Sequence, residues 1–353
     1  MIKIAIFHNL KPGGGLNHLQ NIVSILSKKG FYIDIYSHQN YLIKNIHKNY
    51  YFPINTTKNS FTQIIQATFE LDKKQKQIAK KITKNLYNYI FVFPCNIIQS
   101  PHILKYLPKE KTYYFFLEPK REFYEKTSFD YFKIKRIISR LIRYPIKIYD
   151  QTNCKSSEHI ISNSTFSKNN LKKIYNKKSL VIYPGIKFIK PKKITLNNNH
   201  KFLSLGLLTM LKGHHISAKL VPETEIYGEK SHENIKKFLP KNIFIKNNIE
   251  ERDKNDIYKN HSFFLANQIN ESFGLTTMEA STRKCYIFGK NEGGTSEIIK
   301  NGLNGTLLPT KNIYKTKKII ININQKNKIS FYKTCIIDWN HTINQILKVI
   351  KYE

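Results

Sequence analysis

Two glutamates, Glu271 and Glu279, stand eight positions apart in the stretch NESFGLTTMEA, with Gly274 between them. An apolar run, FFLAN, precedes them at 263–267, and the pattern predicts a strand, a turn and the start of a helix. The amides of 273–277 would then offer unpaired N–H groups and the positive end of the helix dipole to an anion. The flanking carboxylates would accept hydrogen bonds from hydroxyls, such as those of a ribose or a sugar ring. The stretch therefore predicts a nucleotide-sugar site; the alternative is a capped helix with two surface glutamates.

Two further motifs surround this stretch. Upstream, LSLGLLTMLKGHH is typical of a strand that ends at Gly206 and a helix opened by Lys212 and Gly213. A lysine at that place can neutralise a diphosphate leaving group, although a solvated surface lysine is the simpler interpretation without the partner motifs. Downstream, EGGTSEIIKNGLNGTLLP leads from the pair Gly293-Gly294 into a helix, and its later glycines fit a turn back into a strand.

Length and charge limit the classes of protein. The chain has 353 residues, enough for two domains, and 59 Lys and Arg against 24 Asp and Glu give a formal net charge of +35. Four interpretations of this charge stay open: nucleic acid, an anionic membrane face, anionic substrates, or compositional drift. The Tyr and Phe residues fall mostly within strand patterns, which favours a core over a nucleic-acid surface, so no specific nucleic-acid partner is expected.

Compartment and metal signals are weak. The four cysteines are scattered without a CxxC pair, which fits a reducing cytoplasm. The opening apolar run is too short for a signal peptide, and no run approaches the roughly 20 apolar residues of a membrane span. We expect a cytoplasmic protein, peripheral on the inner membrane face if it meets a membrane. No histidine pair has metal-ligand spacing with a carboxylate, so no obligatory metal is expected.

Strand and helix patterns alternate along the whole chain. In the first half, the sequence predicts strands at 2–7, 31–37, 89–94, 112–118, 159–164 and 180–185, with helices at 16–29, 70–87, 121–143 and 165–176. After a polar linker at 187–200, it predicts strands at 201–206, 224–228, 242–246, 263–267 and 285–289, with helices near 213–220, 231–238, 253–260, 274–283, 294–300 and 312–323. Such alternation indicates βαβ units and parallel sheets. We predict an α/β chain of two Rossmann-like, doubly wound domains, 1–188 and 189–338, that face a central cleft, with a last helix in 339–353 packing back toward the N-terminal domain.

Together these motifs resemble glycosyltransferase family 4, the glycosyl transferases group 1, of GT-B fold. The resemblance rests on the Gly-(five)-Lys-Gly unit, on Glu-(seven)-Glu, and on Gly-Gly-x-x-Glu followed by Gly-x-x-Gly. In the N-terminal half, KIAIFHNLKPGGGLNHLQNIVSILSKKGFYIDIYS is similar to the family's opening strand, glycine loop, helix and second strand. FFLEPKREFYE resembles its Pro-x-Arg segment, and Trp339 stands where many members begin their last helix.

The resemblance implies a retaining hexosyltransferase that moves a sugar from a UDP-sugar or GDP-sugar to a hydroxyl of a glycan or lipid-linked acceptor, as in polysaccharide biosynthesis. Two residues would act on the reacting groups: Lys212 would stabilise the departing diphosphate, and Glu271 would contact hydroxyls of the donor sugar. Seven residues would bind the donor through backbone N–H groups, the ribose, or close approach of the N-terminal backbone: Phe273, Gly274, Leu275, Thr276, Glu279, Gly14 and Gly15.

The chain departs from the family pattern at several positions. Leu207 replaces the usual arginine after the first glycine, and Leu117 replaces a histidine found in many members. Arg283 and Lys284 stand where small residues and a proline are usual, and either could restore the lost charge. These changes leave open a weakened or unusual enzyme, or a degenerate protein that binds a sugar nucleotide without turnover. The positive charge leaves open a basic nucleic-acid-binding protein.

One basic stretch, KIKRIISRLIRYPIK at 133–147, mixes cations with Ile and Leu. It could hold anionic lipid, or it could form a packed helix with a solvated basic face, which is the simpler interpretation.

Overall fold

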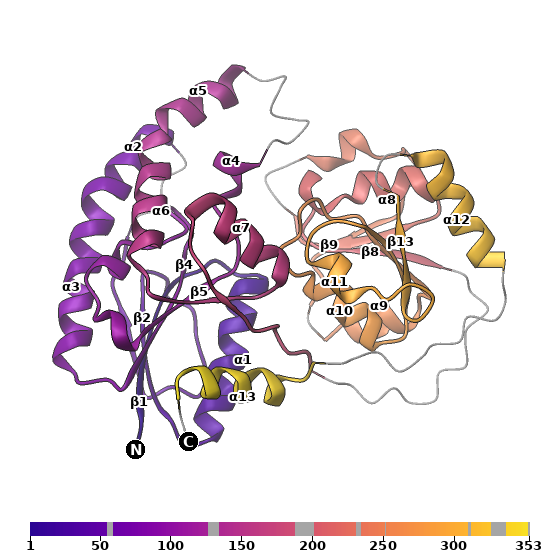
Figure 1. The fold of residues 1–353 in the computed structure, drawn as a ribbon. Coiled ribbons are helices and arrows are strands. Elements are labelled where there is room, and N and C mark those ends of the chain that lie inside the picture. Colours follow the sequence, from indigo (N-terminus) through magenta and orange to yellow (C-terminus); the bar gives the residue numbers. More distant parts are fainter. Residues whose placement is uncertain are drawn as a thin grey trace. The chain divides into compact units, whose positions relative to one another are not determined.

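The computed structural model describes residues 1–54, 59–125, 134–187, 201–230, 234–250, 252–309, 312–325 and 337–351. The chain forms two compact units (Figure 1). Unit 1 comprises Met1–Pro184 and Trp339–Glu353, and unit 2 comprises Gly185–Asp338. The first division lies four residues before the boundary predicted at residue 188, and the second lies at the predicted residue 338.

Unit 1 is built on a seven-stranded parallel sheet in the order β3-β2-β1-β4-β5-β6-β7. Its strands are β1 (Lys3–Asn9), β2 (Tyr32–Ser37), β3 (Lys48–Tyr51), β4 (Tyr89–Cys95), β5 (Thr112–Phe116), β6 (His159–Ser162) and β7 (Leu180–Val181). The central strands are mostly apolar and almost wholly buried, because both faces of the sheet are covered.

Helices pack on both faces of this sheet (Figure 1). The first face carries α1 (Gly14–Lys28) and α13 (Trp339–Val349). The second carries α3 (Leu71–Lys84), α6 (Tyr144–Ser156) and α7 (Thr165–Tyr175), with the short turn η2 (His102–Lys105). Smaller elements complete the unit: α2 (Ser60–Ile65), the π-helical turn η1 (Gln66–Glu70), η3 (Lys109–Lys111), α4 (Arg121–Tyr124) and α5 (Ile134–Ile142).

Unit 2 repeats the same plan with a six-stranded parallel sheet in the order β10-β9-β8-β11-β12-β13. Its strands are β8 (Phe202–Leu205), β9 (Glu225–Gly228), β10 (Ile245–Asn247), β11 (Phe263–Ala266), β12 (Tyr286–Lys290) and β13 (Gly305–Leu308). One face packs against α8 (His214–Leu220) and α12 (Ile313–Gln325), and the other against α9 (Lys254–Lys259) and α10 (Leu275–Thr282). Three short elements, η5 (Met210–Lys212), η6 (Ile235–Phe238) and α11 (Thr295–Ile298), fill the connections. The predicted fold class, two doubly wound parallel α/β domains, is confirmed.

Some elements differ from the sequence prediction. The strand β3 was missed because KNYY is short, polar and without alternation; it forms by pairing with β2. The helix predicted at 121–143 is wrong as one element, since α4 and α5 are separate and 126–133 lie outside the described residues. The helix α6 was missed because its inward face carries polar side chains, Asp150 and Asn153, which hide the apolar period. The helix predicted at 231–238 is a 3₁₀ turn where the structure describes it.

Among the buried histidines of unit 1, His8, His18 and His38 have strongly lowered pKa values and are held neutral. Burial lowers the pKa of His8 to about 3, with the nearby His38 adding to the effect. Burial also lowers the pKa values of His18 and His38 to about 4. His18 lies on α1 and meets the ring of Trp339 on α13, with 5.5 Å between ring centroids.

This burial predicts that unit 1 loses stability in acid. In the unfolded chain histidine titrates near pH 6.5, so below that pH the unfolded state binds protons that the folded state does not. The stabilisation is therefore complete above about pH 6.5 and is lost as the pH falls toward about 4. We expect His18 alone to account for about 3 kcal/mol of this loss. Urea unfolding followed by the fluorescence of Trp339, the single tryptophan, measures it.

The matched variants separate this effect from general acid unfolding. His18→Leu should flatten the dependence of stability on pH by about one proton. His341→Gln changes an exposed residue of α13 and should keep the wild-type dependence. A wild-type stability that stays constant between about pH 6.5 and 4.5 would show that these histidines are not held neutral.

Candidate functional site

The predicted strand–turn–helix stretch forms as expected in unit 2. The strand β11 ends at Ala266, Glu271 lies in the loop, and α10 begins at Leu275 with Glu279 inside the helix. Gly274 is the N-cap residue at φ 98° and ψ 57°, a left-handed conformation that glycine adopts without strain, and no side chain caps this helix end. The first N–H groups of α10 are thus available to an anion.

Two buried hydroxyl groups flank this helix end. A Cβ atom added to Gly274 would lie 3.0 Å from Oγ1 of Thr295 and 3.4 Å from Oγ1 of Thr277. Both threonines are buried, and neither hydroxyl has a hydrogen-bond partner among the described residues. Buried hydroxyls without a partner are rare and costly. They supply donors beside the helix N-terminus that sequence reasoning did not identify, because isolated threonines carry no motif.

The two residues predicted to act on the reacting groups meet directly. Nζ of Lys212 lies 2.6 Å from Oε2 of Glu271, and both side chains are partly exposed. The residues are 59 positions apart, and they meet because β8 and β11 are neighbours whose carboxyl ends share one edge of the sheet. This edge is where doubly wound sheets bind ligands.

Glycine makes this meeting possible on the lysine side. Gly213 follows Lys212 at φ 69°, and an added Cβ atom there would overlap the carbonyl oxygen of Asn267. Any side chain at Gly213 would push the lysine-bearing turn away from the end of β11. The backbone N–H of Ile269 also donates to the carbonyl oxygen of Leu211, at 2.9 Å, which fixes the two segments together.

The pair Gly293-Gly294 supports the loop of Glu271 from the other side. The N–H of Gly294 donates to the carbonyl oxygen of Glu271 at 2.7 Å. A Cβ atom on Gly294 would overlap the carbonyl oxygen of Ser272 and lie 2.6 Å from Cα of Phe273. The sequence indicated only a loop into a helix here, and the structure adds that this loop is a support for the glutamate segment.

Glu279 is oriented by a tyrosine that the sequence analysis did not identify. The hydroxyl of Tyr258, on α9, donates to Oε2 of Glu279 at 2.9 Å. Burial first, and the nearby Glu279 next, raise the pKa of this tyrosine well above its ordinary value, so it stays a hydrogen-bond donor.

Arg283 does not lie where it could replace the charge of the arginine that Leu207 replaces. Its guanidinium lies 5.0 Å from the ring centroid of Tyr258 and donates to Oδ1 of Asn255 and to the carbonyl oxygen of Glu279. That is the C-terminal end of α10, about 12 Å from its N-terminus for eight residues. Lys284 is exposed just beyond that end, and Leu207 is 44% exposed at the end of β8.

Gly14 and Gly15 lie in unit 1, where α1 begins at Gly14. An added Cβ atom on Gly15 would lie 3.2 Å from a methyl carbon of Leu117 and 3.4 Å from one of Leu10, so a larger residue there would have to shift these leucine side chains slightly. Their contact with a donor stays a prediction. Among the described residues, no group of three or more His, Cys, Asp or Glu side chains could hold a metal ion.

Two doubly wound parallel sheets, each covered by helices on both faces, are the arrangement of the GT-B fold. Residues 186–334 match the family model of glycosyl transferases group 1, so this part of the chain carries that family's domain, in agreement with the predicted resemblance to group 1. Its assignment to family 4 within this group stays a prediction. No curated protein sequence matches the chain significantly.

Solved structures share the fold over the full length. Sucrose-phosphate synthase from Thermosynechococcus elongatus aligns with a TM-score of 0.74 at 11% identity, covering 99% of this chain and 98% of that one. HepE from Anabaena, in complex with UDP-glucose, gives 0.67 at 15% identity with both chains fully covered. Starch synthase IV from Arabidopsis thaliana, bound to ADP and acarbose, gives 0.65 at 11% identity over 99% and 98%. None of the described helices is both long and apolar enough to cross a bilayer.

The support by the glycine pair can be tested with Gly294→Ala. The added methyl group must displace Ser272 and Phe273, because Gly294 itself has an ordinary helical φ of −66°. We expect amide hydrogen exchange over 268–276 to become about tenfold faster or more, with a stability loss of about 1–3 kcal/mol. Gly302→Ala is the control: its φ of 77° strains its own turn, but no atom lies within 4 Å of the added carbon. Unchanged exchange over 268–276 in Gly294→Ala would contradict the support.

Proposed function

We propose that the chain is a retaining glycosyltransferase of the hexosyltransferase type. It takes a sugar from a nucleoside diphosphate sugar, a UDP-sugar or GDP-sugar, and transfers it to a hydroxyl of a glycan or lipid-linked acceptor. The contact between Lys212 and Glu271 beside the uncapped start of α10 carries this proposal. HepE and starch synthase IV, which share the fold, are named with UDP-glucose and ADP, and this supports a nucleotide donor.

The ion pair acts as an exchangeable contact. Partly exposed ion pairs contribute only about 0–1 kcal/mol, so a diphosphate can draw the ammonium of Lys212 away at little cost. The carboxylate of Glu271 then accepts hydrogen bonds from hydroxyls of the sugar. Binding of the donor thus replaces the ion pair between Lys212 and Glu271 with two contacts, one from Lys212 to the diphosphate and one from Glu271 to the sugar.

The remaining donor contacts follow α10. Backbone N–H groups of Phe273 and Gly274 face the sugar, and those of Leu275 and Thr276 face the diphosphate at the positive end of the helix dipole. A carboxylate has about four lone-pair sites, so Glu279 can accept from a ribose hydroxyl while Tyr258 holds it. Gly14 and Gly15 are the proposed donor contacts from unit 1, and unit 1 is the proposed acceptor-binding unit.

In the reaction, the bond between the anomeric carbon and the diphosphate oxygen breaks, and the oxygen leaves with the electron pair. Lys212 and the helix amides stabilise the charge that develops there. The acceptor oxygen bonds to the anomeric carbon on the same face, and its proton passes to the leaving diphosphate. No metal is required for this departure. Leu207, which lacks a charge, favours the second candidate function, a protein that binds the donor without turnover.

Lys212→Ala tests the role of the lysine. Because Leu207 contributes no charge, we expect sugar transfer to fall about 10²-fold or more. Lys219→Ala removes an exposed lysine of the same helix region and should leave transfer unchanged. The measurement is transfer of radiolabelled sugar from UDP- and GDP-sugars to a glycan or lipid-linked acceptor pool. Near-normal transfer by Lys212→Ala would exclude this role.

Donor binding is tested apart from transfer by calorimetric titration with UDP, GDP and ADP at moderately high salt, with and without a divalent metal. We expect saturable, metal-independent binding of one nucleotide. Glu279→Ala should weaken it by about tenfold to a hundredfold, as loss of a charged hydrogen bond of about 1.5–3 kcal/mol implies. Tight binding without any transfer would identify the non-catalytic alternative. Equal, weak binding of all three nucleotides, unchanged in the variant, would refute the donor site.

A further inference from the structure

Nine large apolar side chains are exposed over neighbouring helices of unit 1. The surface is named here the α2–α5 face and consists of Phe61, Ile65, Phe69, Ile137, Ile138, Leu141, Ile142, Tyr144 and Ile148. The helix α2 contacts α5 and η1, and α6 contacts α5 and η1, so the elements that carry these side chains are neighbours (Figure 1). Phe61, Phe69 and Leu141 are 64%, 69% and 68% exposed. Single exposed apolar residues need no explanation, whereas a contiguous group marks an interaction surface.

The helix α5 turns its apolar side outward. Its residues Ile137, Ile138, Leu141 and Ile142 follow the spacing of a stripe that normally faces a protein core, yet all are exposed. Arg140 is only half-buried and donates to the carbonyl oxygen of Glu125. The simpler interpretation of this stretch, a packed helix with a solvated basic face, does not account for this exposed apolar side.

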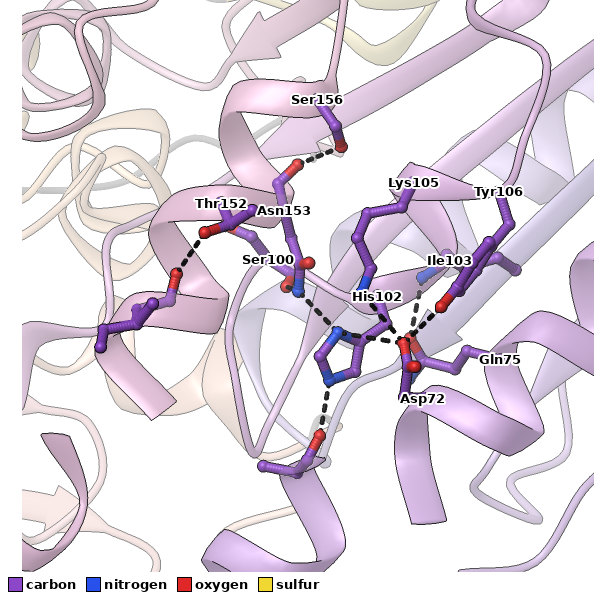
Figure 2. A network of polar contacts seen from close by, with 12 residues as sticks. Asp72, Gln75, Ser100, His102, Ile103, Lys105, Tyr106, Thr152, Asn153 and Ser156 are labelled. Atoms are coloured by element: carbon purple, nitrogen blue, oxygen red, sulfur yellow. Dashed lines mark hydrogen bonds and ion pairs between the residues drawn. The ribbon is translucent and has the colours of Figure 1, made fainter. Parts of the chain in front are cut away.

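A buried polar network fixes the base beneath this face (Figure 2). Nε2 of His102 donates to the carbonyl oxygen of Ala67 in η1 at 2.6 Å, and its Nδ1 accepts from the amide of Asn153 on α6 at 3.2 Å. Asp72 lies 3.5 Å from the same ring nitrogen. The buried imidazole thus joins η1 to α6. Next to it, Oε1 of Gln75 on α3 accepts from the N–H of Ile103 at 3.0 Å, so the segments that carry these apolar side chains are held together. Phe61, Ile65 and Phe69 recur every fourth residue along α2 and η1 and form one row.

The charge around the face is positive. The segment Ile134–Ser156 contains six cationic residues: Lys135, Arg136, Arg140, Arg143, Lys147 and Lys155. Its one acidic residue, Asp150, is fully buried, where it accepts from the N–H of Ser100 and the hydroxyls of Tyr124 and Tyr175. Arg143 lies 2.6 Å from Glu122, so that charge is compensated, and the other five cations still leave the segment with a net positive charge.

We propose that the α2–α5 face docks on the surface of an anionic lipid bilayer. Its apolar side chains would enter the boundary between headgroups and acyl chains, and the lysines and arginines beside them would contact lipid phosphates. A second copy of the chain fits less well, because a two-fold interface would place the cationic segment against itself. A nucleic acid would satisfy the cations but would leave the apolar rows unmatched. The proposal is independent of sugar transfer, and its test needs no nucleotide.

The test is co-sedimentation of the full chain with phosphatidylcholine vesicles, with and without phosphatidylglycerol. We expect binding that requires the anionic lipid and weakens with salt. Leu141→Ser and Phe69→Ser should each weaken binding by about tenfold, because each removes one buried apolar side chain. Tyr314→Ser is the matched control, since it removes an aromatic side chain that is 90% exposed on α12 of unit 2. Unchanged fluorescence of Trp339 verifies that unit 1 of each variant is folded.

Other outcomes overturn the proposal. Equal binding to both kinds of vesicle, or wild-type affinity in Leu141→Ser and Phe69→Ser, would exclude an apolar contact guided by charge. A dimer in sedimentation velocity that Leu141→Ser dissociates, with no vesicle binding, would assign the face to a second copy. Binding of single-stranded RNA that the same variants weaken, again without vesicle binding, would assign it to nucleic acid.

Discussion

The close approach of Gly213 to the carbonyl oxygen of Asn267 is the constraint on which the site in unit 2 depends. The strands β8 and β11 are neighbours in the sheet but distant in sequence. The turn after β8, which carries Gly213, must touch the loop after β11, which carries Asn267. Only a residue without a side chain allows this, and Gly294 meets the same requirement on the opposite side of the loop. With both in place, Lys212 and Glu271 are held at hydrogen-bond distance before any ligand arrives. Such preorganisation is how a site avoids ordering its groups at the moment of reaction.

The sequence predicted local structure better than contacts. The strand, turn and helix around Gly274 could be predicted because apolar runs and glycine act within a few residues. The pairing of Lys212 with Glu271 could not, because it depends on the order of strands in the sheet, which alternation alone does not specify. The hydrogen bond from Tyr258 to Glu279 could not be predicted either, because it also joins distant residues. In addition, an aromatic residue in a helix normally indicates a core residue. The family resemblance supplied the roles of these residues, and the contacts supply a physical basis for them.

Part of the strong positive charge lies beside an exposed apolar surface in unit 1. In α5 and α6 the cations accompany an outward apolar stripe, while the one acid is buried beneath them. This asymmetry was visible in the sequence only as Ile and Leu among Lys and Arg, a pattern that also fits a packed helix. The direction in which the stripe points is decided by the packing of α5 against α2 and α6, which lies beyond the reach of periodicity.

The last helix belongs to the first unit. Ile343 and Ile346 of α13 are fully buried against the same sheet face as α1. Unit 2 is therefore an insertion within unit 1, and the chain passes between the units twice, with Ile186 paired to Asp338 where the two passages run. During synthesis on the ribosome, unit 2 is complete before α13 exists. The first unit made is thus the last to complete its core, and until then α1 covers this face of the sheet without α13.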